Sequence, residues 1–194
     1  KTLDEFDFSF QPSIDTRLMK ELSTLAFAAR KENVIFLGPP GVGKTHLAVG
    51  LAMKAIQSGM TVYYTELSKL IADLKKAEEQ NRLERRWRVY VRPDILIVDE
   101  VGYMQLDRTS AELFFRLICT RYERGSIILT SNKFFSDWGE LMSDAAIATA
   151  MLDRLLHHAH VVNIRGESYR LKDRLKTGVR TAPPADIPVA EHPA

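Results

Sequence analysis

Short apolar segments alternate with amphipathic segments along most of the chain. Runs of β-branched, aromatic or apolar residues predict five strands, at 34–37, 61–65, 95–98, 126–130 and 160–164. Apolar spacings of three and four residues predict helices at 14–30, 44–57, 67–74, 109–123 and 144–157. Strands that are apolar on both faces are typical of a parallel sheet covered by helices on both sides. The pattern therefore predicts an α/β fold with a central parallel five-stranded sheet flanked by helices.

The pattern is less regular at the two ends and in the middle of the chain. Residues 1–12 carry three Phe that fit either a strand or a short arm packed on the domain. The helix that begins at Leu67 is expected to fade within the polar stretch 75–88. Four Pro in the last fourteen residues predict a disordered tail. We expect four parts: an arm and helix at 1–32, a core at 33–165 with a basic helical insertion at about 67–92, a basic lid segment at 166–180, and the tail at 181–194.

Composition narrows the class of protein. With 194 residues, of which 45% are apolar and 27% charged, the chain fits one globular domain. The net charge of +2 says little about partners, so electrostatic arguments must be local. The single Cys119 excludes an intrachain disulfide and favours a reducing, cytoplasmic location. No apolar run approaches the ~20 residues that span a membrane. The start at Lys1 leads us to expect a fragment of a longer protein.

A glycine-rich motif lies between the first predicted strand and the helix at 44–57. Residues 38–45 match G-x-x-x-x-G-K-[ST] at every fixed position. The backbone N–H groups of such a loop surround phosphate oxygens, and the helix N-terminus that follows adds positive potential. Lys44 is expected to reach the β- and γ-phosphates of ATP, and the Thr45 hydroxyl to ligate Mg²⁺. The predicted nucleotide-binding residues are Gly38, Pro39, Pro40, Gly41, Val42, Gly43, Lys44, Thr45 and His46.

Two further strand ends supply polar side chains. The strand at 95–98 runs into Asp99 and Glu100, and open α/β sheets bind ligands at the carboxyl ends of their strands. Asp99 can hold Mg²⁺ directly or through water. Glu100 projects differently and can orient a water molecule for in-line attack, which favours hydrolysis over transfer to an acceptor. Asn132, after the next strand, either bridges that water and the γ-phosphate or forms a turn.

Together these motifs resemble those of AAA+ ATPases, members of the P-loop NTPase class. More closely, the chain resembles the IstB/DnaC-like group of transposition helper ATPases and bacterial helicase loaders. The resemblance covers about 6–174 and is carried by 38–48, 99–100, 121–124, 130–132 and 166–170. Proteins of this group usually have an additional N-terminal helical region for self-assembly and partner contact, which we expect this chain to lack.

The resemblance implies an ATP- and Mg²⁺-dependent ATPase with a reduced lid that self-associates into an AAA+ oligomer. It also makes Asn132 a polar sensor, Arg154 an arginine finger that reaches a neighbour's nucleotide, and Arg170 a second sensor on the lid. An Arg supplied by a neighbour would couple hydrolysis to assembly. From the residues alone, Arg154 fits a solvated helix position equally well, and Arg170 fits an ordinary ion pair. Arg121 and Arg124 are weaker candidates for the subunit contact.

The predicted insertion has a strongly basic end. Residues 82–92 hold five basic side chains and one acid, a local charge of +4, with Trp87 and Tyr90 among them. Basic residues beside aromatic ones are typical of a nucleic-acid contact, although a solvated helix with Glu–Lys pairs also fits. Residues 165–180 are a second, weaker basic candidate. The predicted DNA-binding residues are Lys75, Lys76, Arg82, Arg85, Arg86 and Arg88.

Other conspicuous residues are assigned to packing. Cys119 is expected to be a buried small hydrophobe, and Trp138 to pack in the core or lid. His46, although it follows the phosphate motif directly, is expected to pack on the first helix more than to touch nucleotide. The histidines at 157, 158 and 160 are not expected to bind metal, because adjacent positions on a helix point apart.

The leading hypothesis is an ATPase that assembles on double-stranded DNA and assists a transposase in insertion-sequence transposition. The alternative is a helicase loader of the DnaC type, which would act on single-stranded DNA. A small-molecule P-loop kinase would have no need for Glu100, and a scaffold that only binds ATP would show no turnover. Comparing the affinity for duplex and single strands separates the first two hypotheses.

Overall fold

Five parallel strands form one sheet in the centre of the molecule. The computed structural model describes residues 1–172. The strand order is β2-β3-β4-β1-β5, and every neighbouring pair is parallel. The prediction of a five-stranded parallel sheet is therefore confirmed. The strands are β1 (Asn33–Leu37), β2 (Val62–Glu66), β3 (Ile95–Val101), β4 (Ser126–Ser131) and β5 (Ala159–Asn163).

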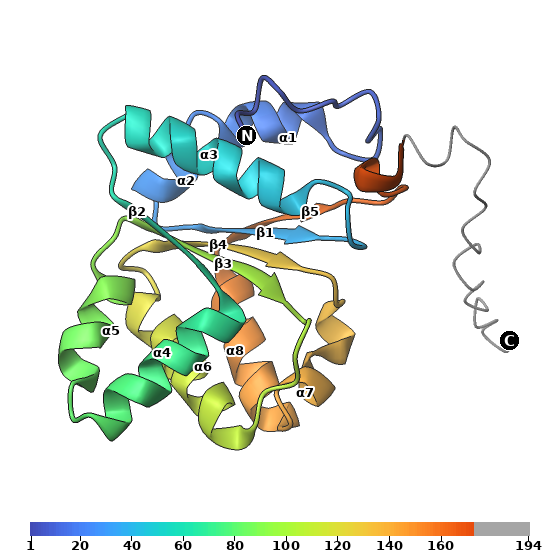
Figure 1. Cartoon of the computed structure of the whole chain (residues 1–194). Coiled ribbons are helices and arrows are strands. Elements are labelled where there is room, and N and C mark those ends of the chain that lie inside the picture. The colour runs from blue at the N-terminus through green and yellow to red at the C-terminus, as the bar shows by residue number, and fades with distance from the viewer. Residues whose placement is uncertain (173–194) are drawn as a thin grey trace, which may run out of the picture.

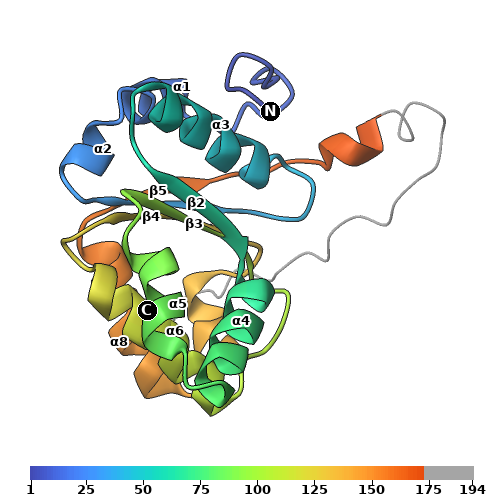
Figure 2. The same cartoon turned by 60° about the vertical axis from the view of Figure 1, so that its left-hand side comes forward.

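Helices cover both faces of the sheet, as Figures 1 and 2 show from two directions. One face carries α1 (Thr16–Leu22), α2 (Ala26–Ala29) and α3 (Lys44–Gln57). The other carries α4 (Leu67–Glu79), α5 (Leu83–Val91), α6 (Arg108–Arg121), α7 (Trp138–Leu141) and α8 (Ala145–His157). Two short 3₁₀ helices are η1 (Phe135–Asp137) and η2 (Tyr169–Leu171). Within the described residues, no helix combines the length and the apolar character that crossing a membrane requires.

The side chains of the central strands alternate between two apolar cores. In β1, Ile35 and Leu37 pack with α4 to α8, whereas Val34 and Phe36 pack with α1 to α3 and the N-terminal arm. All four side chains are buried. Because both faces of the strand are covered, an uninterrupted apolar run is what this position in the fold requires.

The N-terminal region follows one of the two predicted alternatives and differs in one helix. Residues 1–12 form a series of turns and no strand, so the packed arm is the alternative that the structure has. Leu3 is buried, and Phe6 and Phe8 pack against the same core as α3. The single helix expected at 14–30 is two helices, because Leu25 adopts a left-handed backbone conformation with φ of 63°.

The region of the expected helical insertion at about 67–92 contains two helices, and helical structure does not fade at 75–88. α4 continues to Glu79, and the polar stretch 75–88, in which helical structure was expected to fade, contains most of α5. α5 is held by Trp87 and Tyr90, which are only 8% and 2% exposed. Tyr90 lies edge-on to Tyr63, with ring centroids 5.4 Å apart, and its hydroxyl donates to Asp73. These two aromatic side chains therefore belong to the core and are not an exposed stacking surface.

Arg121, one of the two weaker candidates for the subunit contact, is an internal structural residue. It is 1% exposed and donates to the backbone carbonyls of Tyr90, Val91, Asp94 and Ser126 at 2.8 to 3.2 Å. Burial lowers its pKa to about 10, an effect that the carboxylate of Asp94 opposes. The guanidinium thus fastens the end of α6 to the segment between α5 and β3. The contact prediction for Arg121 is wrong because an Arg this deeply buried cannot face a neighbour.

The predictions for 173–180 and for the tail at 181–194 lie outside the described residues.

We expect Arg121→Met to lower the free energy of unfolding by about 3 kcal/mol, because it leaves buried carbonyl groups without donors. Urea denaturation followed by circular dichroism measures the change. Arg124→Met is the matched control, since Arg124 lies in the same turn and is exposed, and surface changes stay within about 0.5 kcal/mol. Equal losses in the two variants would contradict a structural role that is specific to Arg121.

Candidate functional site

The loop between β1 and α3 is held in place by the two ends of the described chain. Gly43 has φ of +100°, and a Cβ at this position would lie 2.5 Å from the Phe6 ring. Gly41 has φ of +84°, and a Cβ there would lie 2.0 Å from the Ser168 hydroxyl oxygen. The Tyr169 N–H also donates to the Gly41 carbonyl at 3.0 Å. Both positions therefore require glycine for backbone conformation and for space.

Lys44 opens α3 and is almost enclosed. Its side chain is 6% exposed, and Nζ donates to the carbonyls of Gly38 and Pro39 at 2.7 and 2.8 Å. Burial lowers its pKa to about 8; the carboxylate of Asp99 opposes this shift and the guanidinium of Arg170 adds to it. The ammonium group is therefore poorly solvated, so an anion placed beside it would be bound strongly.

Asp99 is the centre of a group of hydroxyls. Its Oδ1 accepts from Thr45 Oγ1 at 3.0 Å and from Thr130 Oγ1, and its Oδ2 accepts from Tyr64 Oη at 2.6 Å. Burial and this carboxylate raise the pKa of Tyr64 well above its usual value. Thr45 and Asp99, which were predicted to lie at the same magnesium site, are therefore in contact. Tyr64 and Thr130 were not anticipated, because no spacing motif marks them; only the strand order places them here.

Glu100 leaves the regular path of β3. The register with β4 shifts between Val98 and Val101, and Glu100 has φ of 62°. Its backbone N–H donates to Thr130 Oγ1 at 3.0 Å, in place of a regular ladder bond. A bulge of this kind redirects a side chain next to a functional site. Asp99 therefore stays buried, whereas the Glu100 side chain is exposed and faces the neighbouring cavity.

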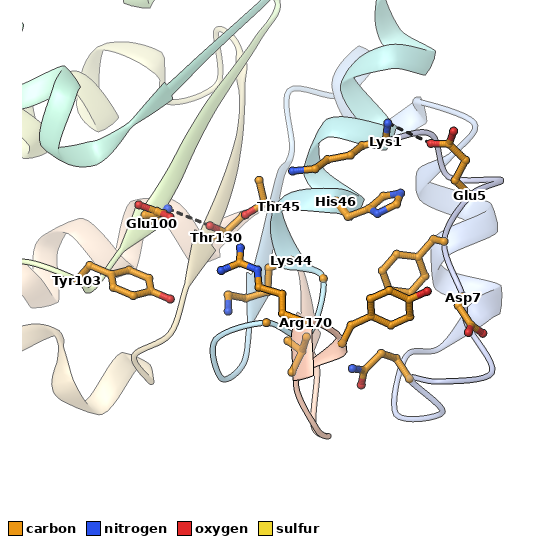
Figure 3. Close-up of a pocket in the computed structure, with 16 residues that line it drawn as sticks. Lys1, Glu5, Asp7, Lys44, Thr45, His46, Glu100, Tyr103, Thr130 and Arg170 are labelled. Atoms are coloured by element: carbon orange, nitrogen blue, oxygen red, sulfur yellow. Dashed lines mark hydrogen bonds and ion pairs between the residues drawn. The ribbon is translucent and has the colours of Figure 1, made fainter. Parts of the chain in front are cut away.

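A cavity lies over these side chains at the carboxyl ends of the strands (Figure 3). Glu100 and Tyr103 border it on one side, with Lys44, Thr45 and Arg170 across from them. Side chains of the arm close the far side, where Figure 3 shows Lys1, Glu5 and Asp7. The cavity thus has one end lined by the phosphate motif and Glu100, and another lined by the arm.

His46 also borders this cavity. Its Nε2 lies 2.7 Å from the carbonyl oxygen of Thr2, and its ring meets the Phe6 ring edge-on at 5.3 Å. The expected packing on the first helix is replaced by packing on the arm. The half-buried Cys119 differs from the fully buried residue expected, whereas Trp138 is fully buried in the core, as predicted.

Two predicted site residues are not among those that line the cavity. Asn132 follows β4, and its Oδ1 would be 2.5 Å from a Cβ added to Gly102. Among the described residues, no partner accompanies this buried oxygen. Arg154 lies near the end of α8, with Nη1 donating to the carbonyl of Ala150 at 3.0 Å and its guanidinium 5.1 Å from the Phe115 ring centroid. That end of α8 leads into β5, so Arg154 lies at the amino edge of the sheet, about 16 Å of strand from the carboxyl edge.

Five of the predicted DNA-binding residues border two grooves beside α4 and α5, and Lys75 does not. They also differ in whether they are paired with acids. Lys75 pairs with Asp107 at 2.8 Å, and Arg86 pairs with Asp73. The remaining four, Lys76, Arg82, Arg85 and Arg88, are exposed. Besides these basic side chains, Asp73 and Gln80 line the first groove, Thr61 and Pro93 the second, and the partly buried Val89 borders both.

Solved structures share this fold. A DnaC helicase loader superposes with a TM-score of 0.65 at 22% identity, covering 77% of this chain and 89% of that one. The AMPPCP-bound DnaA of Aquifex aeolicus gives a TM-score of 0.69 at 22% identity, covering 91% of this chain and 55% of DnaA. At this level of identity the likeness establishes the fold alone, which this chain shares with both proteins.

Sequence relatives are much more similar. A protein of insertion sequence IS21 from Pseudomonas aeruginosa is 57% identical over 181 residues, covering 93% of this chain and 68% of the relative. A protein of IS5376 from Geobacillus stearothermophilus is 52% identical over 174 residues, with 90% and 69% covered. Residues 1–177 match the family described as IstB-like ATP binding protein. The chain therefore belongs to the IstB-like ATP binding protein family of insertion sequences.

Proposed function

We propose that the chain binds ATP with Mg²⁺ in this cavity and hydrolyses it. The observation that carries the proposal is the 3.0 Å hydrogen bond between Thr45 and Asp99, which places the phosphate loop and the acids of β3 at one point. Lys44 and Arg170 supply two positive charges at the same end of the cavity. A triphosphate there would meet backbone N–H groups and two cations, the environment that stabilises its charge.

The donor set fits Mg²⁺. Hydroxyl and carboxylate oxygens are the ligands this hard cation prefers, and the Thr45 hydroxyl and the Asp99 carboxylate lie together. Both groups would hold the cation. When bound, Mg²⁺ would neutralise part of the charge of the phosphates. Thr130 and Tyr64 donate to the same carboxylate, so they fix the direction in which its oxygens point.

Glu100 is suited to orient the attacking water. Its carboxylate faces the cavity, free of the hydroxyl partners that hold Asp99. It can accept a hydrogen bond from water and direct the oxygen toward the γ-phosphorus. The protein would thus use neighbouring carboxylates for two purposes: Asp99 for the metal and Glu100 for the water.

Self-association is part of the proposal, and the position of Arg154 supports it. Because Arg154 lies at the amino edge of the sheet and the cavity at the carboxyl edge, the side chain cannot serve the nucleotide of its own subunit. A neighbouring subunit could receive it, and an arginine supplied in this way stabilises the charge that develops on the γ-phosphoryl group. Arg170 of the same chain would contribute a second positive charge beside the phosphates. Asn132 would help to position the attacking water.

Double-stranded DNA is the proposed nucleic-acid partner, with assistance to a transposase as the proposed role. The sequence relatives that belong to insertion sequences support this context. Single-strand binding relies on exposed aromatic stacking surfaces. The aromatic side chains of α5 are buried, so this surface offers charge alone, which suits a duplex backbone. This observation favours the duplex-binding role over that of a helicase loader.

Lys44→Ala is expected to weaken ATP binding at least ~100-fold, because it removes the poorly solvated cation at the phosphate end. Titration calorimetry with ATP and Mg²⁺ measures the affinity. Lys54→Ala, in the last turn of the same helix, is the control and should bind ATP as the wild type does. An unchanged affinity for Lys44→Ala would show that the triphosphate binds elsewhere.

Glu100→Gln should retain ATP affinity and lower turnover ~10²- to 10⁴-fold, the usual contribution of a positioned base. Phosphate release is measured without any acceptor, and release by the wild type excludes the kinase hypothesis. Glu21→Gln, which alters an exposed acid on α1, serves as the control. Wild-type turnover in Glu100→Gln would remove this residue from the mechanism.

Neutralising Arg85 and Arg88 together to Gln should weaken duplex binding and reduce the slope of log affinity against log salt by about 2. Arg86 is left intact because its pairing with Asp73 supports α5. Fluorescence anisotropy over a range of salt concentrations, with duplex and single-stranded probes, gives both slopes. The control changes Arg17 and Lys20 on α1 to Gln. A slope equal to that of the wild type would place the DNA site elsewhere, and tighter binding of single strands would favour the loader.

A further inference from the structure

A group of possible metal ligands lies far from the cavity, at the amino edge of the sheet. Glu123, His157 and His158 each offer a ligand atom, and these atoms lie within 4.8 Å of one another. The sequence argument against metal binding assumed that both histidines lie on a helix and point apart. α8 ends at His157, and His158 has φ of −130° and ψ of 81°, outside the helical region. The two rings therefore converge, with centroids 4.0 Å apart.

The third possible ligand, Glu123, lies in a strained turn. Glu123 lies between α6 and β4 with φ of 56°, a conformation that costs energy for a residue with a side chain. Its Oε1 lies 3.7 Å from His158 Nε2. Two segments more than thirty residues apart in sequence thus present their polar side chains to the same point.

A neighbouring side chain orients the first histidine. Tyr122 Oη is hydrogen-bonded to Nδ1 of His157, and the two rings are stacked at 26° with centroids 5.9 Å apart. With Nδ1 engaged in this way, Nε2 is the nitrogen left for a metal. An oxygen partner on the other ring nitrogen is the usual second contact of a metal-binding histidine.

We propose that Glu123, His157 and His158 form a site for a divalent transition metal of the zinc type. Two imidazoles and a carboxylate suit Zn²⁺ and its neighbours, whereas Mg²⁺ favours oxygen ligands alone. Bonds of about 2.1 Å to a tetrahedral ion put ligand atoms roughly 3.3 Å apart. All three side chains are exposed, so small rotations bring them to that separation. The fourth position is open to water or to a donor from another molecule.

Binding would join the end of α8 to the turn after α6. Arg154 lies one turn before His157 and shares a small recess with Tyr122, Glu123 and His158. A metal at this point would restrain the segment of α8 that carries Arg154. The metal site itself stands independently of the proposed ATPase function, since it shares no residue with the cavity.

The test uses the full chain without an affinity tag, treated with chelator and free of nucleotide. Calorimetric titration with Zn²⁺ is expected to give one site per chain, and Co²⁺ is expected to give the visible absorption bands of a low-coordinate site. Glu123→Gln, His157→Ala and His158→Ala should each weaken Zn²⁺ binding about 10-fold or more. His160→Ala is the control, because His160 pairs with Glu32 on a neighbouring part of the fold and should leave binding unchanged.

A second readout separates ligation from folding. Zn²⁺ should raise the melting temperature of the wild type and of His160→Ala, but not that of the double variant His157→Ala/His158→Ala, whose circular dichroism without metal should match the wild type. Binding to that double variant with wild-type affinity would overturn the proposal. So would a wild type that shows neither a calorimetric site nor Co²⁺ absorption.

Discussion

The hydrogen bond between Thr45 and Asp99 is the contact on which the site depends. In the strand order, β4 lies between β1 and β3, so the phosphate loop and the acids of β3 belong to strands that are not neighbours. They meet only because all three strands run in the same direction and end at one edge. Thr130 of β4 occupies the intervening position and donates to the same carboxylate. The parallel sheet thus converts two separate sequence motifs into one polar group.

The sheet also explains why adjacent acids differ so much. A regular strand would place Asp99 and Glu100 on opposite faces, one of them inside an apolar core. The bulge at Glu100 avoids that cost and turns its carboxylate into the cavity. The positive φ at Glu100 is the local strain that accompanies this arrangement, and the hydrogen bond from its N–H to Thr130 compensates for the interrupted ladder.

Local signals predicted the fold well, and long-range contacts account for most of the rest. The strands and α3 were found because their patterns are complete within a few residues, and the phosphate motif because its spacing is fixed. The misassigned residues are those whose role depends on distant partners: Arg121 is satisfied by carbonyls from other segments, and Trp87 and Tyr90 are buried by the strands and helices beside them. Tyr64 lies at the site only because β2 is the neighbour of β3 in the sheet. Arg121 and Tyr64 have no local signal of these roles, whereas Trp87 and Tyr90 follow Leu83 at helical spacings of four and three residues, a pattern that indicates a buried helix face.

The cavity is assembled from three separate parts of the chain, and this limits how they can move. Phe6 of the arm and Ser168 near η2 pack closely against glycines of the phosphate loop. The backbone N–H of Tyr169 donates a hydrogen bond to the same loop. An occupant of the cavity would contact all three parts at once. Its binding energy would therefore stabilise the arm and the segment at η2 together with the core, since a ligand stabilises every element whose position its site requires. Arg154 and the histidine pair lie at the opposite edge of the same sheet, so a neighbouring subunit that used that edge would face a core made more rigid by nucleotide.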